Sequence, residues 1–90
     1  MNKDIEIGSL VEALKGRDKT TIYLVLDITS KNEVVLVNGD NKTFEKPKTK
    51  NIKHVKNLNH VVSHLKEKIL SKKSIYDAEV YSCIKKYKEN

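Results

Sequence analysis

Residues 21–29 form the segment that most restricts how this chain can fold, because β-branched and aromatic side chains dominate it. The apolar residues at every second position of this segment are Ile22, Leu24, Leu26 and Ile28. A repeat of two is typical of a β-strand that lays one face on a core. The chain is therefore expected to build a sheet around residues 21–29.

Four more short strands are predicted on both sides of this segment. Glu33–Val37 is apolar on both faces and precedes Asn38-Gly39, a pair that tolerates positive φ and favours a tight hairpin turn. Pro47 should end the strand after that turn, since proline has no N–H to donate to a neighbour. The five predicted strands are Ser9–Leu14, Thr21–Thr29, Glu33–Val37, Lys42–Lys46 and Ile52–Val55. Short strands with closely spaced turn signals favour a small barrel, because closing the sheet removes its exposed edges.

From Leu58 onward the apolar repeat changes to that of a helix. The apolar stripe consists of Leu58, Val61, Val62, Leu65 and Ile69. A second helix is expected to run to about Lys88 from Ser74-x-x-Asp77, which resembles a capping box. Neither helix is long enough to be stable alone, so both are expected to pack on the barrel or on each other.

The predicted fold class is therefore mainly β plus α, in one compact unit. A five-stranded barrel is expected over residues 1–57, and a two-helix extension packed on it over residues 58–90. A chain of 90 residues with 38% hydrophobic and 33% charged residues suits a single small domain with one modest core.

Several classes of protein are excluded by what the sequence lacks. Its apolar runs are too short for a membrane-spanning helix, and residues 1–6 lack the apolar segment of a signal peptide, so a cytoplasmic location is expected. A single cysteine, Cys83, excludes an intrachain disulfide and favours a buried small apolar side chain over a reactive thiol. No membrane partner is expected.

Motifs of catalysis or metal binding are also missing. The sequence has no glycine-rich phosphate loop, no Gly-x-Ser-x-Gly turn and no pair of carboxylates in an apolar setting. His60 and His64 lie four residues apart on the predicted helix, but no third ligand accompanies them, which favours a solvated helix face over a metal site. We therefore predict no enzyme, no metal and no cofactor.

The positive charge of the chain is concentrated in its middle third. The net charge is +6, yet residues 1–45 hold six basic against eight acidic side chains. Residues 46–73 hold nine lysines against the single Glu67, and residues 74–90 hold three basic and three acidic side chains. Such a concentration is the electrostatic footprint of a surface that binds a polyanion. The alternative is a lysine-rich face that serves solubility alone.

The strongest candidate segment for such binding is Lys46–Lys56, in which no acid occurs. Its candidate binding residues are Lys46, Lys48, Lys50, Asn51, Lys53, His54 and Lys56. An extended run after Pro47 would space alternate lysines by about 6–7 Å, close to the spacing of phosphates along a nucleic-acid strand. The alternative is an edge strand that its lysines protect from aggregation.

A second candidate segment is the loop Lys15–Lys19. Its basic side chains are Lys15, Arg17 and Lys19. Arg17 can stack on a base or bind a phosphate through two hydrogen bonds. In the alternative interpretation, Asp18 pairs with Arg17 or Lys19 and the loop is an ordinary turn.

These segments resemble a known family. The stretch Ile7–Lys19, followed by an apolar strand, resembles a KOW motif, in which a strand, a basic Gly-containing loop and a second strand form part of an SH3-like barrel. With the turn Asn38-Gly39-Asp40 and the run Glu45–Val55, the chain resembles the small KOW-domain RNA-binding proteins of Gram-positive bacteria. Those proteins are similar to the ribosomal protein fourteen-e group of the archaeal and eukaryotic large subunit. Thr20 departs from the pattern, which usually has glycine there, and because a β-branched residue resists positive φ a wider turn is expected.

The resemblance implies an RNA-binding module associated with the ribosome or with translation. Its lysine-rich segment and KOW loop would grip the phosphates of ribosomal or transfer RNA. Two alternatives stay open, namely an SH3-like module that binds proteins without nucleic acid and a passive stabiliser within a ribonucleoprotein particle.

Overall fold

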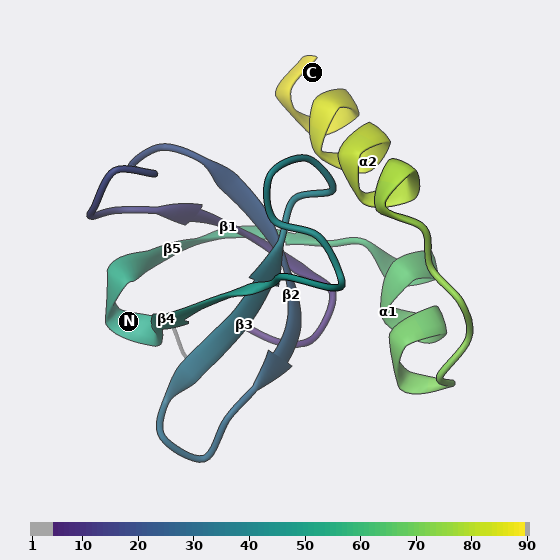
Figure 1. Ribbon diagram of the computed structural model, residues 1–90, viewed down its shortest axis with the longest axis horizontal. Coiled ribbons are helices and arrows are strands. Elements are labelled where there is room, and N and C mark those ends of the chain that lie inside the picture. Colours follow the sequence, from purple (N-terminus) through teal and green to yellow (C-terminus); the bar gives the residue numbers. More distant parts are fainter. Residues whose placement is uncertain (1–4, 90) are drawn as a thin grey trace.

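The strands of the chain form one antiparallel sheet in the order β4-β3-β2-β1-β5, followed by two helices (Figure 1). The computed structural model describes residues 5–89, so residues 1–4, on which the expected lack of a signal peptide partly depends, lie outside it. The elements are β1 (Ser9–Ala13), β2 (Ile22–Ile28), β3 (Glu33–Val37), β4 (Lys48–Asn51), the 3-10 turn η1 (Ile52–His54), β5 (Val55–Val61), α1 (Ser63–Leu70) and α2 (Asp77–Glu89). The predicted number and order of elements, five strands followed by two helices, are thus confirmed, although two of the strands lie elsewhere than predicted.

The sheet is bent by two irregularities in strand pairing. The register of β1 against β5 shifts between Ser9 and Val11, and that of β2 against β3 shifts between Val25 and Asp27. Bulges of this kind bend a strand and increase its twist. Within the described residues β4 and β5 stay the two edges of the sheet, so the predicted closure into a barrel is not seen.

Both faces of the sheet are buried. Neighbouring residues of β1 and β2 point to opposite faces, and the side chains on each face belong to a core cluster. One face forms the first core cluster, with Ile5, Val11, Ala13, Tyr23, Val25, Val34, Leu36 and Val55. The other face forms the second core cluster, with Leu10, Leu24, Val37, Val62, Leu65, Val80 and Ile84. The predicted burial of Leu24 is confirmed, while Ile28 at the end of β2 is exposed.

The two helices lie on the same side of the sheet and cover the second cluster (Figure 1). Leu65 of α1 and Val80 of α2 are fully buried there. An ion pair between Lys68 and Glu79, with the Nζ and Oε2 atoms 2.7 Å apart, links the helices. The helices thus provide the apolar cover that the outer face of an isolated sheet would lack. Neither helix within residues 5–89 is both long and apolar enough to cross a bilayer.

The predicted strand at residues 42–46 is wrong, because Asn38 begins a loop rather than a tight hairpin. The Asn38 Oδ1 atom accepts the N–H groups of Asp40 (2.9 Å) and Lys42 (3.0 Å), which curls the chain. The N–H of Phe44 then bonds to the Asp77 carboxylate at 3.1 Å instead of to a strand. The fourth strand consequently starts only at Lys48.

The predicted helix start at Leu58 is also wrong, because residues 58–61 continue β5. This strand pairs with β1, for instance Val11 with Asn57 and Ser9 with Val61. The predicted fifth strand Ile52–Val55 is mostly the turn η1. A short apolar run is compatible with both a helical and a strand repeat. Here the unpaired edge of β1 binds the segment as a strand. The expected division between residues 57 and 58 therefore falls inside β5.

Gly39 is required where the loop after β3 meets α2. Its φ is 75°, and a Cβ atom there would lie 2.2 Å from the Asp77 carbonyl oxygen and 2.7 Å from the Tyr81 nitrogen. Only glycine allows the backbones to approach so closely without strain.

We expect Gly39→Ala to lower the free energy of unfolding by about 2–4 kcal/mol, from left-handed strain and overpacking together. Gly16→Ala is the matched control, since Gly16 also has positive φ (91°) but has no backbone atom against it. The control should lose only about 1–2 kcal/mol. Urea unfolding measures both, and equal losses would show that the contact with α2 does not restrict position 39.

Candidate functional site

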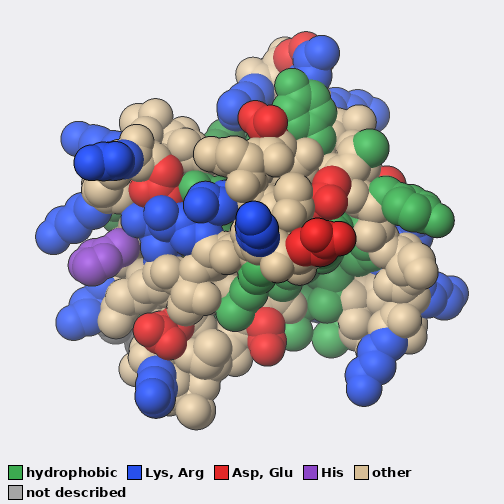
Figure 2. All heavy atoms as spheres, in the orientation of Figure 1, with side chains coloured by type: hydrophobic (Ala, Val, Ile, Leu, Met, Phe, Trp, Pro, Cys, Tyr) green, Lys and Arg blue, Asp and Glu red, His purple; other side chains and the backbone are tan. Residues whose placement is uncertain are grey.

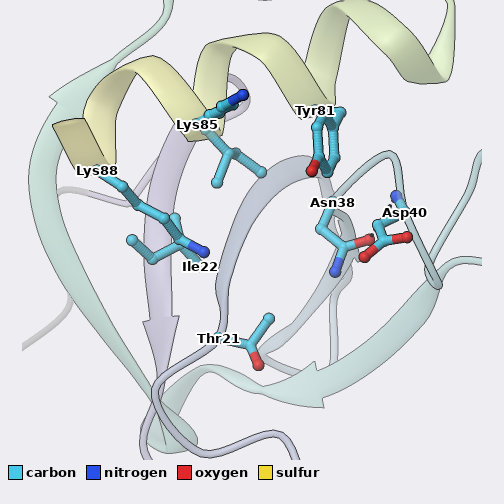
Figure 3. Close-up of a pocket in the computed structure, with 8 residues that line it drawn as sticks. Thr21, Ile22, Asn38, Asp40, Tyr81, Lys85 and Lys88 are labelled. Atoms are coloured by element: carbon cyan, nitrogen blue, oxygen red, sulfur yellow. Dashed lines mark hydrogen bonds between the residues drawn. The ribbon is translucent and has the colours of Figure 1, made fainter.

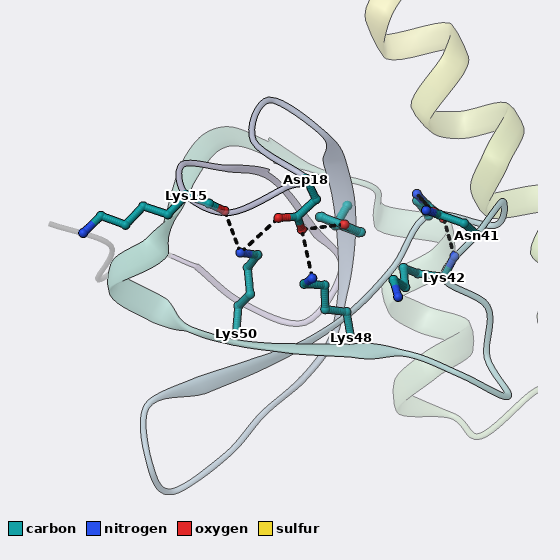
Figure 4. A network of polar contacts seen from close by, with 8 residues as sticks. Lys15, Asp18, Asn41, Lys42, Lys48 and Lys50 are labelled. Atoms are coloured by element: carbon teal, nitrogen blue, oxygen red, sulfur yellow. Dashed lines mark hydrogen bonds and ion pairs between the residues drawn. The ribbon is translucent and has the colours of Figure 1, made fainter.

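A partly buried carboxylate joins the two candidate segments. The Oδ2 atom of Asp18 accepts a hydrogen bond from the Tyr23 hydroxyl (2.7 Å) and lies 3.5 Å from Lys48 Nζ, while Oδ1 lies 3.2 Å from Lys50 Nζ (Figure 4). Lys50 Nζ also donates to the carbonyl oxygen of Lys15 at 2.9 Å. We call Asp18, Tyr23, Lys48 and Lys50 the Asp18 cluster. It ties the β1–β2 loop to strand β4.

Strand geometry explains why two lysines reach one carboxylate. Lys48 and Lys50 are alternate residues of β4, so their side chains project from the same face of the strand. Backbone hydrogen bonds from Thr20 to Ala13 (2.8 Å) and from Thr21 to Asp18 (2.9 Å) close the loop that presents the carboxylate to them.

The cluster shifts the pKa values of its two acidic members in opposite directions. Burial raises the pKa of Asp18, but the Tyr23 hydroxyl, Lys50 and Lys48 together outweigh burial and bring the pKa below its ordinary 3.8. Burial, and then the adjacent Asp18 carboxylate, raise the pKa of Tyr23 well above its ordinary value of 10.0. The carboxylate is therefore charged and the phenol neutral at neutral pH.

Several residues of the predicted binding site instead make contacts within the protein. The Lys50 side chain is 11% exposed and that of Lys48 is 31% exposed, both against Asp18. Asn51 caps η1, because its Oδ1 atom accepts the N–H of Lys53 at 2.9 Å. The pairing of Asp18 with Arg17 or Lys19 is wrong, since both ion pairs of Asp18 run to β4. The loop is nevertheless a turn, as that alternative held, with the Lys19 N–H bonded to the Gly16 carbonyl oxygen at 3.2 Å.

The remaining predicted residues lie outside the Asp18 cluster, and most of them are exposed. Lys15, Arg17 and Lys19 are exposed on the β1–β2 loop, Lys53 and Lys56 are exposed in η1 and β5, His54 is half-buried, and Lys46 is exposed in the turn before β4. The Leu14 N–H bonds to the His54 carbonyl oxygen at 2.9 Å, which joins the loop to η1. In Figure 2, basic side chains gather on the left, where Figure 1 places this loop and η1, with acidic side chains between them.

The lysine-rich segment is consequently not one extended ridge. Only Lys48–Asn51 is a strand, whereas Lys46 lies in a turn closed by its N–H bonding to the Thr43 carbonyl oxygen at 3.1 Å. Folding instead brings the β1–β2 loop, η1 and the start of β5 together at one end of the sheet, through the Leu14 N–H bond to His54 and the pairing of Ala13 with Val55.

The histidines and the cysteine lie elsewhere. His60 belongs to β5 and His64 to α1, so they do not share a helix as predicted, and His64 Nε2 lies 3.8 Å from Cys83 Sγ. Burial and the nearby Glu79 raise the pKa of the partly buried Cys83 thiol, which favours its neutral form. Within residues 5–89, no three side chains of the metal-binding types form a group that could hold an ion.

Sequence reasoning missed a group of residues near the start of β2. They line two open depressions that share Thr21, one of about 330 Å³ beside Arg17 and Lys42, and one of about 160 Å³ beside Tyr81 (Figure 3). The only local signal was that Tyr81 falls outside the apolar stripe of its helix.

Comparisons with known proteins do not place the chain in a family. No protein-family model matches it, and no curated protein matches it significantly. The resemblance to KOW proteins therefore stays a prediction that rests on the residues themselves.

Thr20 has the conformation that glycine favours. Its φ is 74°, in the left-handed region, although a β-branched side chain resists this region. The loop accommodates Thr20 through strain rather than by avoiding positive φ.

We expect Thr20→Gly to raise the free energy of unfolding by about 1 kcal/mol, because relief of left-handed strain exceeds the entropy cost of glycine. The control is Thr21→Gly, at a residue outside the positive-φ set, which should lose about 0.5–1 kcal/mol. Urea unfolding distinguishes the two, and a loss of stability in both variants would contradict the strain.

We expect Asp18→Asn to lower the free energy of unfolding by about 1–3 kcal/mol at pH 7, because Lys50 loses its counter-charge in a largely buried position. The folded-state pKa of Asp18 is lowered, so its stabilisation is present above pH 3.8 and is lost as the pH falls through the lower folded value. The difference between wild type and variant should therefore vanish in acid. Asp40→Asn, at an exposed carboxylate, is the control; a difference independent of pH would contradict the assignment.

Proposed function

We propose that the chain is an RNA-binding module built on an SH3-like barrel of the KOW type. Three observations support the barrel, namely the bent sheet, the pairing of the first strand with the last, and an inner core cluster drawn from β1, β2, β3 and β5. The order of β1, a basic loop with Gly16, and the apolar β2 also agrees with the motif that the sequence resembles.

The observation that carries the proposal is the set of exposed cations on the β1–β2 loop, η1 and β5, together with a loop carboxylate that is already neutralised. Asp18 is the acid of the β1–β2 loop, and two ammonium groups lie against it. The cluster therefore has a net positive charge and does not repel a phosphate. A second acid, Glu12, stands across from Lys56 in the pairing of β1 with β5. Among the described residues no ion pair is formed by the exposed cations Lys15, Arg17, Lys19, Lys53 and Lys56.

The roles of the predicted residues divide accordingly. The exposed cations of the loop, η1 and β5 contact phosphates, because a charged side chain in solvent can reach a phosphate oxygen on the surface. Lys48 and Lys50 hold the loop in place through Asp18 and add positive charge beneath the exposed cations. Asn51 fixes the backbone of Lys53 by accepting its N–H. By resemblance alone, the bound polymer is ribosomal or transfer RNA in the cytoplasm.

We expect the triple variant Lys15→Glu, Arg17→Glu and Lys53→Glu to lose most of its affinity for a labelled RNA stem-loop with an unpaired tail. For about five phosphate contacts on single-stranded RNA, the logarithm of wild-type affinity should fall with that of salt at a slope near −3 to −4. Fluorescence anisotropy at several salt concentrations measures both quantities.

The matched control is Lys72→Glu, Lys73→Glu and Lys86→Glu, which makes the same change in net charge at exposed positions away from the loop. Equal losses in both variants would place binding elsewhere. Absence of wild-type binding would overturn RNA as the ligand, and capture of a protein partner that survives nuclease and high salt would favour the protein-binding alternative.

A further inference from the structure

The depression between α2 and the start of β2 lies outside the predicted site. Ile22 and Ile84 give it apolar walls, and Lys85 and Lys88 of α2 border it. Figure 3 shows Lys88 extending over Ile22 on one side, and Tyr81 above Asn38 on the other. Its volume of about 160 Å³ is well below the roughly 300–1,000 Å³ of pockets that enclose whole small ligands. It therefore suits one ring system of a larger molecule.

The backbone that carries Tyr81 is held against the loop after β3. The close approach of Gly39 to the Asp77 carbonyl oxygen and the Tyr81 nitrogen sets the first turns of α2 directly against the loop. The hydrogen bond from the Phe44 N–H to Asp77 (3.1 Å) holds the same contact. Tyr81 as a whole residue is nevertheless 48% exposed, which leaves its side chain open to a stacking partner.

The charges around the depression distinguish its two sides. Lys85 and Lys88 attract phosphate, whereas Asp40, on the side of Asn38 and Tyr81, repels it (Figure 3). A carboxylate at that position can accept a hydrogen bond from the amino group of a base. An aromatic ring beside cations that follow a backbone is the arrangement that binds single-stranded nucleic acid.

The depression also continues into the site proposed above. Thr21 lines it together with the neighbouring depression of about 330 Å³, which Arg17, Lys42 and Lys48 border. A polymer that leaves Tyr81 along this surface thus reaches the β1–β2 loop, where the exposed cations lie.

We propose that this depression holds one unpaired base of RNA, stacked on Tyr81, with Lys85 and Lys88 on the adjoining phosphates. The proposal rests on the proposed function and adds that the preferred ligand has a single-stranded segment. A base in a duplex is already paired and stacked on its neighbours, so it cannot enter without being extruded.

The test compares Tyr81→Ala with wild type in anisotropy titrations of a short unpaired oligoribonucleotide and of the duplex formed with its complement. We expect the variant to bind the single strand roughly fivefold to a hundredfold more weakly, the usual effect of removing one base–aromatic stack. Its affinity for the duplex should be unchanged. Tyr81→Phe should bind the single strand like wild type, because the ring carries the stacking.

The matched control is Tyr76→Ala, at a tyrosine that is 70% exposed and lies just before α2, outside both depressions. It should leave binding of both probes unchanged. Equal binding of the single strand by Tyr81→Ala and wild type would overturn this inference while leaving the proposed function intact, as would equal losses on single strand and duplex. Failure of the wild type to bind any RNA would overturn both.

A free nucleoside monophosphate is the third probe. We expect the wild type to bind it negligibly. A monophosphate can contact only this depression and its two lysines, whereas RNA also contacts the cations of the β1–β2 loop. If it bound as tightly as the oligonucleotide and Tyr81→Ala abolished that binding, the depression would be a nucleotide site and the assignment to RNA would be wrong.

Discussion

The need to bury both faces of one small sheet governs the arrangement of this molecule. Residues next to each other in β1 and β2, such as Leu10 and Val11, are fully buried on opposite faces. The sheet meets this need on one side by bending around its own side chains, and on the other side by taking two helices as a cover. Neither solution works alone for so short a chain, since an open flat sheet or an isolated helix would leave apolar surface in water.

The Asp18 cluster shows how charge is organised on this frame. A carboxylate with little exposure to water is costly unless it is paired, and here two ammonium groups and a phenol surround it. The pairing fastens the β1–β2 loop to the edge strand β4 and leaves one positive charge in excess. Lys48 and Lys50, which the sequence suggests as ligand-binding residues, therefore have a structural role. Lys15, Arg17 and Lys53 are exposed to solvent.

The two proposals place different kinds of contact on adjoining surfaces. The loop, η1 and β5 present cations, which suit a phosphate backbone irrespective of base sequence. The depression beside Tyr81 combines a ring, apolar walls and a carboxylate, which suit a base. Because Thr21 borders both depressions, a single strand can use the two surfaces in succession. Affinity would then come mainly from the loop, and preference for unpaired RNA from α2.

The sequence alone determined the features that depend on near neighbours along the chain. The alternation at residues 22–28 predicts β2, and the run at Glu33–Val37 predicts β3. The second helix lies in the predicted region, but its predicted start at the Ser74-x-x-Asp77 capping box is wrong, because α2 begins at Asp77 and Glu79 accepts the N–H of Tyr76. Tertiary structure alone decided that residues 58–61 pair with β1, that Asp18 meets Lys48 and Lys50, and that Tyr81 and Thr21 line one depression. The physical reason is that strand pairing and charge pairing depend on distance through space. A short apolar run or a lone carboxylate is compatible with several partners until the chain has folded.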